Sequence, residues 1–93
     1  MKVNSMAIAK HINFKGYVQG VGFRFTANSV AKRYELTGFV RNKDDGGVEM
    51  LVQGDPQDID DCIEDLKETF TVRDLEIEEV PVNTSYDNFR ITF

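Results

Sequence analysis

Gly16-Tyr17-Val18-Gln19-Gly20-Val21-Gly22-Phe23, followed directly by Arg24, lies where a strand pattern changes into a helix pattern. Residues 11–18 alternate between apolar and polar side chains, which is typical of a half-buried strand. Residues 24–35, together with Phe23, carry apolar side chains at helical spacing, which predicts an amphipathic helix. The stretch is therefore expected to be a glycine-rich turn between a strand and the first turn of a helix.

A turn of this kind can bind an anion. Glycines at 16, 20 and 22 allow the backbone to turn tightly and present its N–H groups without a Cβ in the way. N–H groups at a helix start also lie at the positive end of the helix dipole. Arg24 adds a planar, permanent cation that suits phosphate. The stretch thus indicates a cradle for a tetrahedral oxyanion, although a plain strand-to-helix turn explains it equally well when it is taken alone.

Two nucleotide-binding motifs are absent from the sequence. The Walker A motif needs a Gly-Lys-Ser/Thr triplet, which does not occur. Gly20 and Gly22 begin a G-x-G-x-x-G pattern, but Phe25 stands where the third glycine is required. The chain is also too short to build well the parallel sheet that this second motif accompanies.

The rest of the chain predicts a hairpin, a second helix and two more strands. Residues 37–42 and 47–53 read as strands joined by a turn at Asp45-Gly46-Gly47. Asp55 can cap the next helix and Pro56 suits its first position. The buried stripe of this helix is expected to hold Ile59, Cys62, Ile63, Leu66 and Phe70.

Two further strands close the pattern. Residues 72–80 are expected to direct Leu75 and Ile77 inward. Residues 88–93 are expected to direct Phe89, Ile91 and Phe93 inward. The order β-α-β-β-α-β with a short terminal strand predicts an α+β, ferredoxin-like sandwich, an antiparallel sheet with two helices on one face.

Composition limits the classes of function. The chain has 93 residues and a net charge of −5, which argues against broad binding to nucleic acid or to an anionic membrane. A single domain over residues 9–93 is expected, with residues 1–8 as a flexible N-terminal extension. The start of the chain lacks an apolar signal stretch, and a cytoplasmic monomer is expected. Because the whole chain is negatively charged, an anionic substrate must be attracted by a local cluster of positive side chains. This cluster is expected to contain Lys15, Arg24, Arg41 and Lys43.

The one cysteine and the one histidine carry no chemistry in this interpretation. Cys62 lies on the apolar stripe of the second helix and is expected to be a small core residue instead of a nucleophile. His11 is expected on the surface of a strand without an identifiable partner. A Cys-based or His-rich metal site is therefore excluded, and no metal or cofactor is expected.

A second segment identifies a family. Residues 16–24 read G-x-V-Q-G-V-G-F-R, and residues 38–49 read G-F-V-R-N-x-x-D-G-x-V-E. Together they closely resemble the acylphosphatase family, and the resemblance extends from about residue 9 to residue 93. Phe39 departs from the Trp that is more frequent in this family, an exchange of one aromatic ring for another.

The resemblance implies the same ferredoxin-like fold and the hydrolysis of the carboxyl-phosphate bond of small-molecule acylphosphates. It implies that Arg24 binds the phosphoryl oxygens and that Asn42 orients the attacking water. It implies that the rest of the phosphate site is formed by the backbone N–H groups of Gln19, Gly20, Val21, Gly22 and Phe23.

Physical chemistry supports these roles. In a split βαβ unit the first two strands run parallel, so their carboxyl ends, followed by the cradle and by Asn42, lie at one edge of the sheet. The leaving carboxylate needs no general acid, because its conjugate acid has a pKa of about 4. Asn42 does not titrate, so it can position a water molecule but cannot be a base. The water proton is therefore expected to pass to a phosphoryl oxygen.

Two other functions fit parts of the pattern. A non-catalytic anion-binding or regulatory module on the same fold is the main alternative, because fold does not determine function. Arg24 and Asn42 together favour the enzyme, since a binder needs no amide to orient water. An RNA-binding sheet is disfavoured, because Lys15-Gly16-Tyr17 matches only the start of the RNA-recognition motif.

Overall fold

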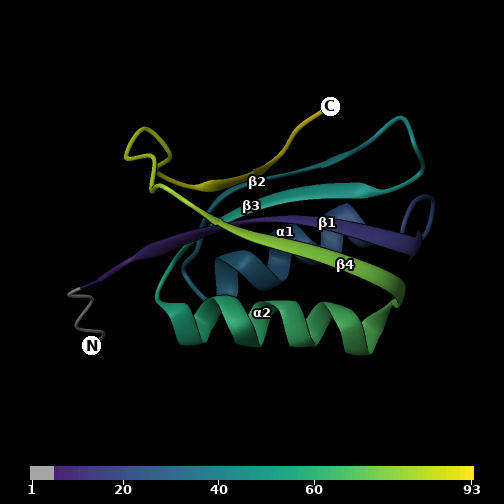
Figure 1. Cartoon of the computed structure of the whole chain (residues 1–93), viewed down its shortest axis with the longest axis horizontal. Coiled ribbons are helices and arrows are strands. Elements are labelled where there is room, and N and C mark those ends of the chain that lie inside the picture. Colours follow the sequence, from purple (N-terminus) through teal and green to yellow (C-terminus); the bar gives the residue numbers. More distant parts are fainter. Residues whose placement is uncertain (1–5) are drawn as a thin grey trace.

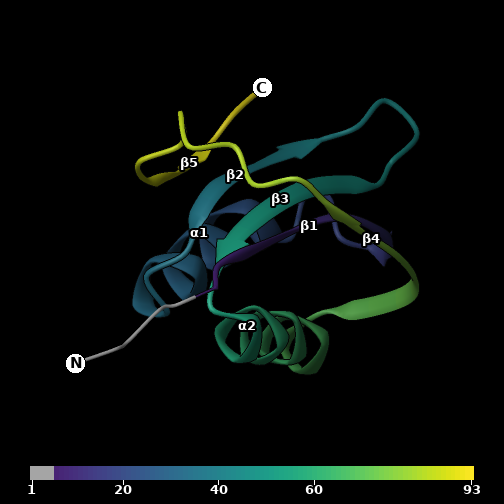
Figure 2. The same cartoon turned by 60° about the vertical axis from the view of Figure 1, so that its left-hand side comes forward.

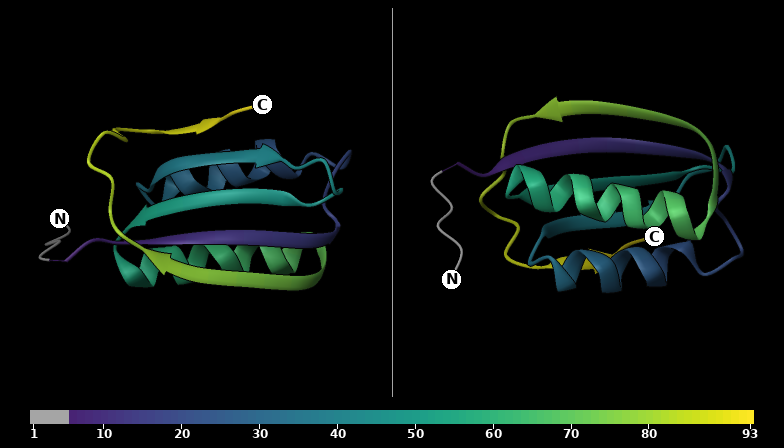
Figure 3. Two further views of the ribbon diagram at one scale, coloured as in Figure 1. Left: turned by 45° about the horizontal axis from the view of Figure 1, so that its top comes forward. Right: turned by 90° about the horizontal axis from the view of Figure 1, so that it is seen from below.

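The computed structural model describes residues 6–93, which form a two-layer α+β sandwich (Figure 1). Its elements are β1 (Ile8–Tyr17), α1 (Phe23–Arg33), β2 (Thr37–Asn42), β3 (Val48–Gly54), α2 (Pro56–Thr69), β4 (Thr71–Val80) and β5 (Phe89–Ile91). Both helices cover the same face of the sheet, as the view from below in Figure 3 shows. The predicted ferredoxin-like β-α-β-β-α-β order is confirmed.

The expected extension over residues 1–8 falls partly outside the described residues, since these begin at residue 6. Ile8 already belongs to β1 and pairs with Gly54. Within residues 6–93, neither helix is long and apolar enough to cross a bilayer.

The sheet brings the ends of β1 and β2 to the same edge. Its strand order is β4-β1-β3-β2-β5. β3 pairs antiparallel with both β1 and β2, so that Phe14 and Asn42 both lie opposite Val48. β1 and β2 therefore run parallel, and the turn after β1 lies beside the hairpin after β2, as the sequence predicts.

β5 completes the sheet in an orientation that the predicted antiparallel sheet did not include. It pairs parallel with β2, so the sheet is mixed. Residues 81–88 carry the chain across to this edge (Figure 2). Gln53 holds this connection, because its buried amide donates to the Asn83 carbonyl and accepts from the Asn83 N–H. The connection thereby brings β5, near the end of the chain, into contact with α1.

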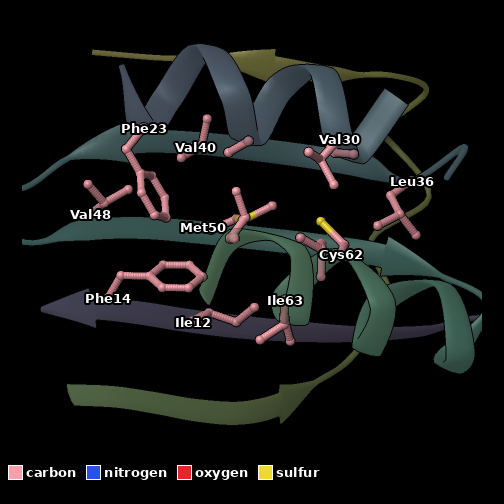
Figure 4. Packing of buried hydrophobic residues seen from close by; sticks show 14 of the residues in the cluster. Ile12, Phe14, Phe23, Val30, Leu36, Val40, Val48, Met50, Cys62 and Ile63 are labelled. Atoms are coloured by element: carbon pink, nitrogen blue, oxygen red, sulfur yellow. The ribbon is translucent and has the colours of Figure 1, made fainter. Parts of the chain in front are cut away.

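The core fixes the start of α1 against the sheet. Phe23, the first residue of the helix, is buried, and its ring lies 4.9 Å from that of Phe14 and 4.8 Å from that of Phe70. Figure 4 shows Phe14 and Phe23 at one end of the core and Met50 and Cys62 nearer its centre. Because these side chains are fully buried, the glycine-rich turn is attached to a rigid element.

Gly16 has a different role from the one expected of it. It lies within β1, where the register with β4 shifts between Lys15 and Gly16. A Cβ on Gly16 would lie 2.5 Å from the Thr71 carbonyl oxygen, so glycine is required by the close passage of β4. Only Gly20 and Gly22 of the three glycines shape the turn itself.

Two sequence expectations, the end of α1 and the inward direction of Phe93, are wrong in detail, and a third, for Ile77, holds for direction but not for full burial. α1 ends at Arg33 instead of residue 35, because Glu35 takes a left-handed φ of 58° and the Leu36 N–H closes the helix on the Ala31 carbonyl. Ile77 faces the helices opposite Ile12, yet it is 46% exposed because β4 is an edge strand. Phe93 is 96% exposed, since β5 stops at Ile91.

Candidate active site

The turn after β1, the first turn of α1 and the end of β2 enclose a cavity of about 210 Å³. Its lining residues are Val18, Gly20, Gly22, Phe23, Arg24, Phe25 and Asn42. Arg24 and Asn42, which are far apart in the sequence, thus face one small space. The structure thus brings together the two residues to which the family resemblance gives a part in the reaction.

The start of α1 leaves backbone donors free at this cavity. Gly22 precedes the helix in a left-handed conformation with φ of 81°, and no described side chain caps the helix. Thr26 is the first helix residue whose N–H makes a helical hydrogen bond, to the carbonyl of Gly22 at 3.1 Å. The N–H groups at positions 23–25 therefore lack helical partners. They form a positive end that is available to an anion.

The start of α2 differs from that of α1, because side chains compensate for the backbone N–H groups that have no helical partner. Asp55 accepts a hydrogen bond from the Gln57 N–H at 2.9 Å, Pro56 removes one donor, and Asp58 adds a negative charge in the first turn. α1 has none of these three devices. The contrast shows that the start of α1, unlike that of α2, leaves its first backbone donors uncapped.

Asn42, the last residue of β2, contributes an unpartnered acceptor. Its Oδ1 atom is buried, yet it accepts no hydrogen bond within residues 6–93. Buried polar atoms are nearly always hydrogen-bonded, so an orphan of this kind needs an explanation. Asn42 is also one of the residues that line the cavity with Arg24, so the unpartnered acceptor belongs to a residue of the candidate site.

Arg24 is the one cation of the expected local group that has no acidic partner among the described residues. Lys15 pairs with Glu76 at 3.0 Å, Lys43 lies 3.7 Å from Asp45, and Arg41 pairs with Glu49. The expected four-membered positive group is therefore reduced to Arg24, because carboxylates neutralise the other three. Its guanidinium is left free for an anion.

His11 has a partner that the sequence analysis did not find. Its Nε2 donates to Glu49 Oε2 at 2.6 Å, on the sheet face away from the helices. Burial raises the pKa of Glu49, but hydrogen bonds from His11 and Arg41 outweigh it and hold the pKa below its usual value. The group is a structural ion cluster outside the cavity.

A larger hollow of about 520 Å³ lies between α1 and α2. Asp65 and Glu68 line it together with Arg33, and Arg33 already pairs with Asp65 at 3.4 Å. Two carboxylates would repel an anionic substrate, so this hollow is unsuited to phosphate chemistry.

Comparisons with known proteins agree with this geometry. The sequence model of the acylphosphatase family matches residues 10–91. The chain is 40% identical over 86 residues to the acylphosphatase of Geobacillus kaustophilus, covering 89% of this chain and 92% of that one. It is 34% identical to the acylphosphatase of Oceanobacillus iheyensis, covering 88% and 94%. The chain belongs to the acylphosphatase family.

A solved acylphosphatase structure supports the fold as well. The crystal structure of the acylphosphatase from Bacillus subtilis is similar, with a TM-score of 0.86 and 32% identity, covering 92% of this chain and 99% of that chain. Family, curated relatives and structure together support acylphosphatase hydrolase activity for this chain.

The five cradle residues do not all face the cavity. Gly20, Gly22 and Phe23 line it, whereas Val21 is exposed and does not, and the Gln19 side chain turns toward the hairpin after β2. Sequence reasoning missed Phe25, which lines the cavity, and Phe93, whose ring lies 5.1 Å from the Arg24 guanidinium carbon. No local pattern signals Phe93, because its contact joins distant parts of this acylphosphatase chain.

Proposed function

We propose that this chain hydrolyses the carboxyl-phosphate bond of a small-molecule acylphosphate, releasing a carboxylate and inorganic phosphate. The phosphoryl group is held by Arg24 and by the backbone N–H groups of residues 19–23. Asn42 orients the attacking water. The observation that carries the proposal is that Asn42, whose buried Oδ1 has no hydrogen-bond partner within residues 6–93, lines the same cavity as Arg24.

Phosphate binding is supported by two sets of donors for which the structure shows no hydrogen-bond acceptor within residues 6–93. Arg24 has no carboxylate, and the first N–H groups of α1 have neither a side-chain cap nor a helical carbonyl. Phosphoryl transfer spreads charge over three equatorial oxygens, and donors fixed in advance stabilise that charge. A guanidinium and a row of amides suit this distribution.

Hydrolysis is supported by the side-chain carbonyl oxygen of Asn42, which is a hydrogen-bond acceptor. The Asn42 carbonyl can accept a hydrogen bond from water and hold the water oxygen toward phosphorus. Because an amide does not take up the water proton, the proton passes to a phosphoryl oxygen as the P–O bond to water forms. The bond to the carboxylate breaks, and this leaving group needs no protonation.

The alternative is an anion-binding module without catalysis. A site built only to hold an anion would present donors, whereas an unpartnered carbonyl oxygen repels phosphate. The Asn42 Oδ1 atom is therefore better explained by a water molecule than by the phosphoryl group itself.

Hydrolysis of benzoyl phosphate in the presence of a chelator tests the proposal. We expect hydrolysis that inorganic phosphate inhibits competitively and that Arg24→Ala abolishes. Arg90→Ala is the matched control, because Arg90 is an exposed arginine on β5 that contacts Asn88. Phosphate binding without hydrolysis by the unmodified protein would contradict the proposal and favour the binding module.

A further inference from the structure

We propose that the Gln19 side chain is a positioning residue that holds Asn42 where it orients the attacking water. This inference rests on the hydrolysis proposed above. The family resemblance implies a role only for the Gln19 backbone N–H. The side chain itself does not line the cavity, so its contribution acts through Asn42.

The Gln19 amide links the turn after β1 to the hairpin after β2. Its Nε2 donates to the Lys43 carbonyl and to the Gly47 carbonyl, each at 2.7 Å. Both partners are carbonyl oxygens, which only accept, so these contacts fix which end of the amide faces them. One planar group thereby fixes two points of the hairpin.

These two points determine where Asn42 lies. Lys43 follows Asn42 directly, and the Lys43 N–H donates to the Gly47 carbonyl at 2.8 Å. On its other side, Asn42 is held by its pairing with Val48 in the β2–β3 ladder. Gln19 itself precedes the glycines of the turn. A single side chain therefore sets the separation between the phosphate cradle and Asn42.

Loss of this amide would affect geometry more than folding. The Lys43 carbonyl also accepts from the Gly46 N–H at 3.3 Å, and the Gly47 carbonyl also accepts from the Lys43 N–H. Neither carbonyl would lose its last donor, so the large penalty of an unsatisfied buried group does not arise. A misplacement of a catalytic group by about 1 Å, in contrast, can cost on the order of 10²-fold in rate.

Gln19→Met tests the role, because methionine has a similar length and no donor. We expect turnover of benzoyl phosphate to fall by about 10- to 100-fold, with the inhibition constant of inorganic phosphate unchanged. Gln57→Met is the matched control, since Gln57 lies on α2 and donates to Asp61 at 3.0 Å, away from the cavity. An equal loss in turnover and in phosphate affinity would overturn the proposal, as would failure of Gln19→Met to fold.

A double-mutant cycle with Asn42→Ala shows whether Gln19 acts through Asn42. Once Asn42 is removed, little remains to be positioned, so Gln19→Met should lower the residual turnover far less than it does in the wild type. Additive losses would overturn the positioning role while leaving the proposed function intact. An inactive wild-type protein would instead contradict the proposed function itself.

Gln19→Glu gives a second readout. A carboxylate cannot donate to the two carbonyls and repels them, so this variant should be slower than Gln19→Met at neutral pH. A protonated carboxyl group regains one donor. The turnover of Gln19→Glu relative to wild type should therefore rise as the pH is lowered, and a ratio independent of pH would overturn the proposal.

Discussion

The Arg24 guanidinium lies over the ring of Phe93, with its central carbon 5.1 Å from the ring centroid. A cation–π contact uses the face of the guanidinium, whereas phosphate binds along its N–H edge. Both contacts can therefore exist at once. The Phe93 ring, although 96% exposed, covers one face of the proposed phosphate-binding group.

Phe93→Ala is expected to weaken phosphate binding by about 2- to 5-fold. Without the ring, phosphate must itself order the Arg24 guanidinium, and the exposed cation–π contact that now holds this group contributes about 0.5–1 kcal/mol. Phe93→Tyr keeps an aromatic face and should bind phosphate as the wild type does. Titration calorimetry with inorganic phosphate measures the difference. A loss of thermal stability in Phe93→Ala instead would mean that the ring supports the fold.

Arg24→Lys is expected to be nearly as inactive as Arg24→Ala. A single ammonium group cannot replace a planar guanidinium that donates along two directions, even though the charge is retained. Arg33→Lys is a suitable control, because Arg33 is exposed and pairs with Asp65. Near-normal phosphate affinity in Arg24→Lys would contradict the assignment of Arg24 to phosphate binding.

Cys62 is expected to be unreactive in the folded protein. Burial raises the pKa of its thiol to about 12, so the thiolate is scarce at neutral pH. Iodoacetamide should modify Cys62 only after unfolding, and Cys62→Ala should retain turnover. Cys62→Ser should lower the free energy of unfolding by about 1–3 kcal/mol, because it buries a hydroxyl group in the apolar core. Rapid alkylation of the native protein would show that the thiol is accessible.

Glu49 is expected to make the protein less stable in acid. Since the pKa of Glu49 is lowered from 4.5 in the folded state, its stabilising effect is complete above about pH 4.5. The effect is lost as the pH falls through the lower folded pKa, when the carboxylate releases His11 and Arg41. Urea unfolding between about pH 3 and pH 7 should show a shallower loss of stability for Glu49→Gln. The same loss in both proteins would exclude Glu49 as a cause.

Local pattern predicted the parts of this fold that depend on local chemistry. The alternation in β1, the turn glycines Gly20 and Gly22 and the Asp55-Pro56 helix start each depend on a few neighbouring residues, and the structure confirms each to within a few positions. The pairing of β1 and β2 with a shared neighbour then followed from the element order. Arg24 and Asn42 were named through the family resemblance, and the structure places both at one cavity.

Contacts between residues far apart in the chain have no local sequence pattern that predicts them. The Gln19 bonds to Lys43 and Gly47 and the contact of Phe93 with Arg24 join segments whose spacing carries no periodicity. Phe93 continues the alternation of Phe89 and Ile91, but the strand ends before it, and strand ends are set by pairing with β2. Likewise, the acidic partner of Lys15 on β4 could not be read from neighbouring residues.

The most direct test of the account compares turnover and phosphate affinity in Asn42→Ala, with the exposed Asn88→Ala as the matched control. If Asn42 orients water without holding phosphate, turnover of benzoyl phosphate should fall by about 10²- to 10³-fold. The affinity for inorganic phosphate should stay close to that of the wild type. Equal losses of turnover and affinity would show that Asn42 shapes the cavity instead of the reaction, and would contradict the account.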